Sequence, residues 1–162
     1  MPATTSHASN GSNGSDEAFR QPLDRSFSYR LHELGKLSDP VSHQAYLAEA
    51  GLSLSDGRCL ITIGNFAPLS IKDLARLSHL DKSQASRAAQ NLIQQNLVSK
   101  QDSQTDGRGV VLMLTPEGRQ RREAAERLVM RRNQEIFGCL TPDELALLSG
   151  MLDRLIAHNQ RC

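Results

Sequence analysis

The chain has 162 residues, enough for one domain or for two small lobes that share a core. Its formal net charge is +1 and 38% of its residues are apolar, so it is no polycation, and any anion binding must come from a local arrangement of charges. No run of 18 apolar residues occurs, so we expect no membrane-spanning helix and no membrane partner. The three cysteines form no CxxC pair and no secretion signal precedes them, which favours a reduced, cytoplasmic protein.

The first 50 residues divide into a polar tail and a helix. Residues 1–18 are rich in Ser, Asn, Gly and Thr and hold too few apolar side chains to offset chain entropy, so we expect a disordered tail. From about residue 20 to 50, apolar residues recur at spacings of three and four, as in a helix. Pro40 should kink or break this helix near Asp39, because proline lacks the backbone donor and clashes one turn back. The apolar positions are Phe27, Leu31, Leu34 and Leu37.

Three helix starts follow, each marked by a capping residue with a polar side chain three positions later. Ser53 begins the first of these helices, and two short helices begin at Ser70 and near Asp81. Only the turn "LSHL" separates the two short helices, and such a tight pair predicts a helix-turn-helix. The helix after Ser53 should bury Cys59, Leu60, Ile63 and Phe66.

A β-hairpin should follow the helix-turn-helix. A strand begins after Leu97, and a strongly apolar strand runs from Val110 to Leu114. Between them lies Asp106-Gly107, a strong hairpin signal because both residues tolerate positive φ. A hairpin at this place in the chain is a wing.

Two helices close the chain. Thr115 should cap a long helix to about Gly138, with Pro116 at its first position. Thr141 with Glu144 should cap the last helix in the same way. The predicted apolar faces are Ala124, Ala125, Leu128, Ile136 and Phe137 on the long helix, and Leu145, Leu148, Met151, Leu152, Leu155 and Ile156 on the last.

The second helix of the helix-turn-helix, within "LDKSQASRAAQNLI", has an unusual polar face. It contains no carboxylate between Lys82 and Lys100, and a phosphate-lined groove would repel carboxylates. Arg, Gln and Ser are side chains that hydrogen-bond base edges, and a helix-turn-helix places its second helix in the major groove. The ordinary alternative is an amphipathic helix with a solvated face. Arg108, expected at the hairpin tip, could enter a minor groove or be a solvated loop charge.

The order of these elements, together with "DGRGVVLMLTPEG", resembles the multiple-antibiotic-resistance regulator (MarR) family of bacterial repressors. The family's wing signature is Asp-x-Arg, a short apolar strand, then Leu-Thr, two residues and Gly. The chain supplies it with Asp106, Arg108, Leu114, Thr115 and Gly118, and the resemblance covers roughly residues 20–160.

The resemblance implies a homodimer whose terminal helices interlock and whose recognition helices enter successive major grooves of pseudo-palindromic double-stranded DNA. It also implies wing arginines in the flanking minor grooves, and many members release DNA when a small, often phenolic or aromatic-acid, ligand binds between the dimer and DNA lobes. Pro40 departs from the usual pattern in the first helix. We expect DNA contacts from Ser70, Lys82, Ser83, Gln84, Ser86, Arg87, Gln90, Asp106 and Arg108.

The predicted fold is mainly α with a small β-wing. Residues 52–115 form the winged helix-turn-helix, and residues 19–51 with 116–162 form a helical dimerisation region. The terminal helices are too long and too distant in sequence to cover one small lobe, so their apolar stripes need a partner, and a symmetric partner fits a two-fold operator. The alternative is that they pack only on each other within one chain.

An anionic aromatic effector would need one cation and one aromatic or hydroxyl partner in a partly apolar cleft. The candidates on the first two helices are Tyr29, Arg30, His32, Arg58 and Thr62. The alternative reading is that both arginines are surface charges and that His32 is a packed or interface histidine.

Other chemistry has less support in the sequence. The histidines show no zinc-type spacing with each other or with cysteine, and no catalytic triad order or phosphate-binding loop is present, so we predict no metal, no cofactor and no enzyme activity. Two rival functions stay open: a thiol-based redox sensor that uses Cys59 or Cys139, and a winged-helix protein-interaction module without a DNA role.

Overall fold

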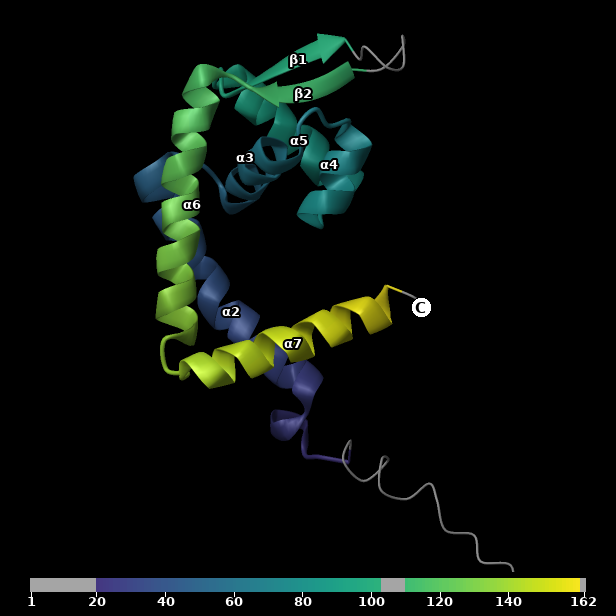
Figure 1. The fold of residues 1–162 in the computed structure, drawn as a ribbon, viewed down its shortest axis with the longest axis vertical. Helices are drawn as coiled ribbons and strands as arrows, with labels where there is room; N and C mark the ends of the chain where they lie inside the picture. The colour runs from purple at the N-terminus through teal and green to yellow at the C-terminus, as the bar shows by residue number, and fades with distance from the viewer. Residues whose placement is uncertain (1–19, 103–109, 161–162) are drawn as a thin grey trace, which may run out of the picture. The chain divides into compact units, whose positions relative to one another are not determined.

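The computed structural model describes residues 20–102 and 110–160, drawn in colour in Figure 1. They belong to two compact units, one up to Pro40 and one from Val41 onward. The first unit holds the short 3-10 helix η1 (Leu23–Arg25) and most of helix α2 (Phe27–Ala45).

Helix α2 continues through Pro40, so a break near Asp39 is wrong, while the alternative, a kink at this place, stays a prediction. Proline removes only the one hydrogen bond that residue 40 would donate, and the residues on either side remain helical. A π-helix, η2 (Tyr46–Ala50), extends α2 and ends at Gly51, which has a φ of 63°. The buried Tyr46 ring lies against α3, where a Cβ on Gly57 would be only 2.2 Å from it.

The helix-turn-helix consists of α4 (Ile71–Ser78) and α5 (Lys82–Gln94), preceded by α3 (Leu54–Phe66). The predicted caps are confirmed: the side chains of Ser53, Ser70 and Asp81 each accept a hydrogen bond from the backbone N–H three residues later. His79 takes the left-handed conformation that ends α4, with a φ of 54°.

The predicted hairpin strands are also confirmed. Strands β1 (Val98–Asp102) and β2 (Val110–Leu114) pair antiparallel, with Val98 opposite Leu114 and Asp102 opposite Val110. Leu69, in the segment before α4, exchanges two backbone hydrogen bonds with Leu112, at 2.8 and 3.3 Å. These bonds fasten the sheet to the start of the helix-turn-helix.

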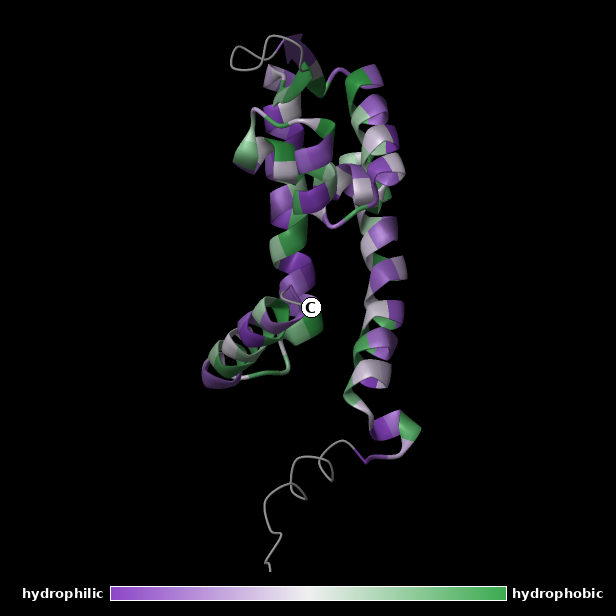
Figure 2. Ribbon diagram, turned by 90° about the vertical axis from the view of Figure 1, so that its right-hand side faces the viewer, coloured by the Kyte–Doolittle hydropathy of each residue, from purple (hydrophilic) through white to green (hydrophobic). Residues whose placement is uncertain are grey.

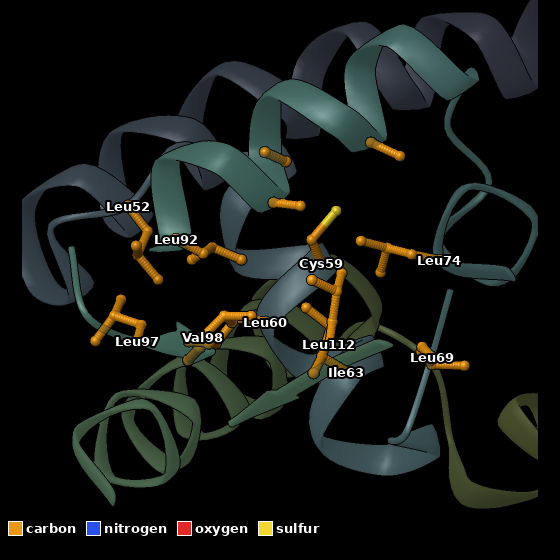
Figure 3. Packing of buried hydrophobic residues seen from close by; sticks show 14 of the residues in the cluster. Leu52, Cys59, Leu60, Ile63, Leu69, Leu74, Leu92, Leu97, Val98 and Leu112 are labelled. Atoms are coloured by element: carbon orange, nitrogen blue, oxygen red, sulfur yellow. The ribbon is translucent and has the colours of Figure 1, made fainter. Parts of the chain in front are cut away.

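One apolar core joins α3, α4, α5 and the sheet, and Figure 3 shows its side chains in a single cluster. Burial of such side chains is the main source of stability of this lobe. Phe66 is not part of the core, contrary to the prediction, because it ends α3 and is 54% exposed. The core members labelled in the figure are Leu52, Cys59, Leu60, Ile63, Leu69, Leu74, Leu92, Leu97, Val98 and Leu112.

Helix α6 (Pro116–Phe137) begins at a tightly built junction with the sheet. The Thr115 hydroxyl accepts from the Gly118 N–H at 2.9 Å and donates to the Asn96 carbonyl at 2.7 Å. The Thr115 N–H donates to the Leu97 carbonyl at 3.1 Å. A Cβ on Gly118 would lie 1.9 Å from that same Leu97 oxygen, so only glycine fits there without a shift.

Two consecutive arginines tie α6 to the ends of neighbouring helices. Arg121 donates to the Ala50 carbonyl at 2.6 Å, at the end of η2. Arg122 donates to the Gly64 carbonyl at 2.9 Å and to Asn65 Oδ1 at 2.6 Å, near the end of α3. Carbonyls in the last turn of a helix lack partners within the helix, so these guanidinium groups stabilise both ends.

Helix α7 (Pro142–Asn159) carries the predicted capping box of Thr141 and Glu144 but has no buried residue. Figure 2 shows hydrophobic segments along this helix, which leads to the label C. Between α6 and α7 lies an apolar groove of about 790 Å³. The groove is lined by Met130, Asn133, Gln134, Phe137, Gly138, Leu145, Leu148, Ser149 and Leu152.

Candidate nucleic-acid interface

Helix α5 has two faces of opposite character. Its inner face packs on α3 and α4 through small side chains, which let the helix backbones approach closely. The inner residues Ala85, Ala88, Ala89 and Leu92 are buried. All six residues predicted to contact DNA from this helix are exposed: Lys82, Ser83, Gln84, Ser86, Arg87 and Gln90. The helix therefore presents one continuous polar surface without a carboxylate.

The capping box at the start of α5 is complete. Asp81 Oδ1 accepts from the Gln84 N–H at 2.8 Å, and Gln84 Oε1 accepts from the Asp81 N–H at 3.2 Å. The side chains of Arg87 and Gln90, by contrast, form no hydrogen bond or ion pair with any residue that the structure describes. Of the long side chains Gln84, Arg87 and Gln90, Gln84 is thus the one that a described residue already engages.

Ser70 is half-buried at the start of α4. Its hydroxyl accepts from the Asp73 N–H at 3.1 Å and donates to Asp73 Oδ2 at 2.7 Å. Both bonds belong to the helix cap, and a DNA contact by Ser70 stays a prediction.

The wing adds a cation that the sequence reasoning missed. Lys100, exposed on β1, lies beside the recognition helix and lines a hollow of about 160 Å³ with Ser86 and Gln90. The sequence did contain a signal for Lys100, because the stretch without a carboxylate that begins after Lys82 ends at this lysine. Asp106 and Arg108 lie outside the described residues, so their predicted DNA contacts stay predictions.

The five candidate effector residues are divided between the two units. Tyr29, Arg30 and His32 lie on α2 in the first unit, and all three are exposed. Arg58 and Thr62 lie on α3 in the second unit, where Arg58 is exposed. Thr62 is 9% exposed, and its hydroxyl donates to the Arg58 carbonyl at 2.8 Å. Their role in effector binding stays a prediction.

Tyr46 is a further polar side chain near Arg58 that the sequence reasoning did not single out. Burial raises the pKa of its phenol, and the positive charge of Arg58 partly opposes that shift. The sequence gives only a weak signal for Tyr46, because a single tyrosine near the end of a helix is usually interpreted as a core residue.

The two described cysteines differ in exposure. Cys139 is exposed in the turn between α6 and α7. Cys59 is buried, and this burial raises the pKa of its thiol to about 11; the Asp56 carboxylate adds to the rise, and a hydrogen bond with Ser78 opposes it. The thiolate that a redox sensor needs is therefore strongly disfavoured at Cys59.

Two further observations concern residues 20–102 and 110–160. No three His, Cys, Asp or Glu side chains in these ranges gather in a way that could hold a metal ion. None of the helices in these ranges is long and apolar enough to cross a membrane.

Comparison with known proteins agrees with this architecture. The model of the MarR family matches residues 50–109, from the end of η2 into the hairpin. A putative transcriptional regulatory protein for the hcr operon of Thauera aromatica is 33% identical over 96 residues. That alignment covers 59% of this chain and 58% of the relative, so the chain matches less than two thirds of the relative's length.

Solved structures match over more of the chain. A MarR/EmrR family transcriptional regulator from Acinetobacter sp. ADP1 superposes with a TM-score of 0.79 at 19% identity, over 88% of this chain and 100% of that one. A Mycobacterium tuberculosis MarR family protein in complex with salicylic acid has a TM-score of 0.66 at 26% identity, over 82% and 97%. The match of the MarR family model across the helix-turn-helix and the fold shared with these solved structures make the chain similar to the winged helix-turn-helix proteins of the MarR family.

Proposed function

We propose that the protein is a homodimeric transcriptional regulator that acts as a repressor in the cytoplasm. It binds a pseudo-palindromic DNA operator and releases it when a small aromatic acid binds. The observation that carries the proposal is the exposed face of α5, where serine, glutamine, arginine and lysine side chains stand without a carboxylate. Such a face suits the major groove, whose base edges offer hydrogen-bond partners and whose walls are anionic.

The division of labour on DNA follows from the side chains. Arg87 has a guanidinium that none of the described residues engages, which suits the bidentate contact to guanine. Lys82 and Lys100 flank this face and suit phosphate oxygens, which position the protein and carry no base information. Arg108 of the predicted wing tip would enter the flanking minor groove.

The exposed apolar residues of α7 support the homodimer. Leu147, Met151, Leu155 and Ile156 are each at least half exposed, and Leu152 lines the groove with α6. Exposed apolar side chains that gather on one element are typical of interaction sites. A second copy related by a two-fold axis would cover it and place the two recognition helices about 34 Å apart, one turn of B-DNA.

The effector is the part of the proposal that depends most on relatives. The similar M. tuberculosis protein was solved with salicylic acid, an aromatic acid of the class proposed here. A tenfold loss of operator affinity needs only about 1.4 kcal/mol of tighter effector binding to the DNA-incompetent arrangement. We place Arg30, His32 or Arg58 near the carboxylate, with Tyr29 and Thr62 as further contacts.

Footprinting on the DNA upstream of the protein's own coding sequence tests the whole proposal. We expect a protected site with two-fold symmetry, and loss of protection with some member of a panel of benzoates, hydroxycinnamates and pyridine carboxylates. If calorimetry detects no binder, or if binders leave protection unchanged, the effector part fails and the DNA part stands. If even random DNA fragments show no salt-dependent shift, the DNA role fails and a protein-interaction module takes its place.

A further inference from the structure

The recognition helix exposes two glutamines that are held in different ways. Gln84 lies in the first turn of α5, and its Oε1 accepts from the Asp81 N–H at 3.2 Å. Gln90 lies further along the same exposed face, and its amide makes no hydrogen bond within the described part of the chain. Identical side chains therefore offer different hydrogen-bonding groups to a ligand.

Chemistry fixes the orientation of the Gln84 amide. A backbone N–H can only donate, so the atom that meets it must be the amide oxygen and not the amide nitrogen. The second bond of the capping box, from the Gln84 N–H to Asp81 Oδ1 at 2.8 Å, holds the residue in the same place. What Gln84 has left for a partner outside the helix is its pair of Nε2–H donors.

This orientation conflicts with the usual way in which glutamine reads a base. Adenine is bound through both ends of the amide, because Nε2 donates to N7 while Oε1 accepts from the N6 amino group. To do this, Gln84 would have to release the Asp81 N–H and give up the capping bond. A donor-only amide instead matches guanine, whose O6 and N7 both accept, and thymine O4. On adenine it meets a single acceptor, N7, next to the opposing N6 amino group, and on cytosine it meets only the N4 amino group.

We propose that Gln84 is a specificity-determining residue that selects a keto base, guanine or thymine, at one position of each half-site. Recognition of adenine through both ends of an amide then falls to Gln90. The inference rests on the proposed DNA-binding function and adds to it which base class each glutamine reads.

The test compares base preferences of the full-length wild type, Gln84→Glu and Gln84→Ala on operators that carry each of the four bases at each half-site position. Glutamate keeps an acceptor for the Asp81 N–H and suits the first turn of a helix, so this variant should fold. It replaces the two donors with acceptors. Preferences are taken as ratios within each variant, so the general repulsion between a carboxylate and DNA cancels.

We expect one position where the wild type prefers keto over amino bases by about fivefold, the lower end of a good base contact. Gln84→Ala should lose that preference, and Gln84→Glu should invert it towards cytosine or adenine. The matched variant Gln90→Ala should instead remove an adenine preference at a different position.

Three results would overturn the inference. Gln84→Ala could abolish a preference for adenine, which would show that the capping bond opens on DNA. It could lower affinity equally for all sequences, which would make Gln84 a phosphate contact. If the wild type shows no base preference at any position, the proposed function itself fails. This outcome is distinct from failure of the Gln84 inference, because it is seen with the wild type alone.

Discussion

Replacement of Gly118 by alanine tests how the long helix is joined to the winged lobe. The added Cβ would lie 1.9 Å from the Leu97 carbonyl oxygen, about 1 Å closer than real Cβ contacts come. The obstacle is backbone, and the Leu97 side chain is 1% exposed, so rotation of a flexible side chain cannot relieve the contact. Either the start of α6 or the end of the α5–β1 connection must move.

The cost follows from what such a shift disturbs. Overpacking of this kind costs about 1 to 3 kcal/mol. The Leu97 oxygen also accepts from the Thr115 N–H, and loss of that hydrogen bond adds about 1 kcal/mol. Alanine regains about 1 kcal/mol in helix propensity over glycine. We therefore expect Gly118→Ala to lower the free energy of unfolding by about 2 kcal/mol.

Urea unfolding measures this difference, with all variants at one protein concentration because association stabilises the folded state. With a typical slope of about 2 kcal/mol per molar, the midpoint should fall by about 1 M. Gly150→Ala on α7 is the matched control, since no atom of the described residues outside the adjacent turns of α7 lies within 4 Å of the added Cβ, and its midpoint should stay or rise. If both variants shifted the midpoint upward alike, the junction would not be as rigid as its geometry indicates.

Four further predictions follow from the interface, the groove and the two described cysteines. Arg87→Ala should cost about 1 to 3 kcal/mol in operator binding and relax base preference at one position; an unchanged preference in a titration of labelled operators would refute the assignment of α5. Leu152→Asp puts an unpaired charge in the α6–α7 groove and should convert a dimer to monomers in sedimentation, unless the wild type is already monomeric at micromolar concentration. At neutral pH, iodoacetamide should modify Cys139 and spare Cys59 in the native protein. Because the pKa of the Cys59 thiol rises from 9.0 to about 11 on folding, its contribution to the free energy of unfolding should be complete below pH 9 and should be lost as the pH rises towards 11. The Cys59→Ala variant should not show this loss in urea unfolding at the same pH values.

Local signals in the sequence predicted most of the winged lobe. Ser53, Asp81 and Thr141 cap their helices as expected, because a capping bond depends only on residues three positions apart. The apolar spacing of α5 likewise identified its buried side, since helical periodicity is local. The family resemblance is supported by the match of the MarR family model to residues 50–109.

The errors and omissions involve longer-range packing or competition between effects. Pro40 carries a strong breaking signal, yet the rest of α2 compensates for one lost hydrogen bond. Phe66 fits the apolar spacing of α3, but the chain ends that helix where the core ends. The role of Arg122 could not be predicted, because its partners Gly64 and Asn65 lie more than 50 positions away in sequence.

The contact between Arg122 and Gly64 has a consequence for how such chains can diverge. A Cβ on Gly64 would lie 2.3 Å from the Arg122 side chain, so a larger residue at position 64 requires the arginine to shift from its place against the carbonyl it binds. The two positions should therefore covary among homologues. Chains that keep glycine at 64 can keep the long cation at 122, whereas chains with a side chain at 64 should carry a shorter residue at 122 and end their α3 by other means.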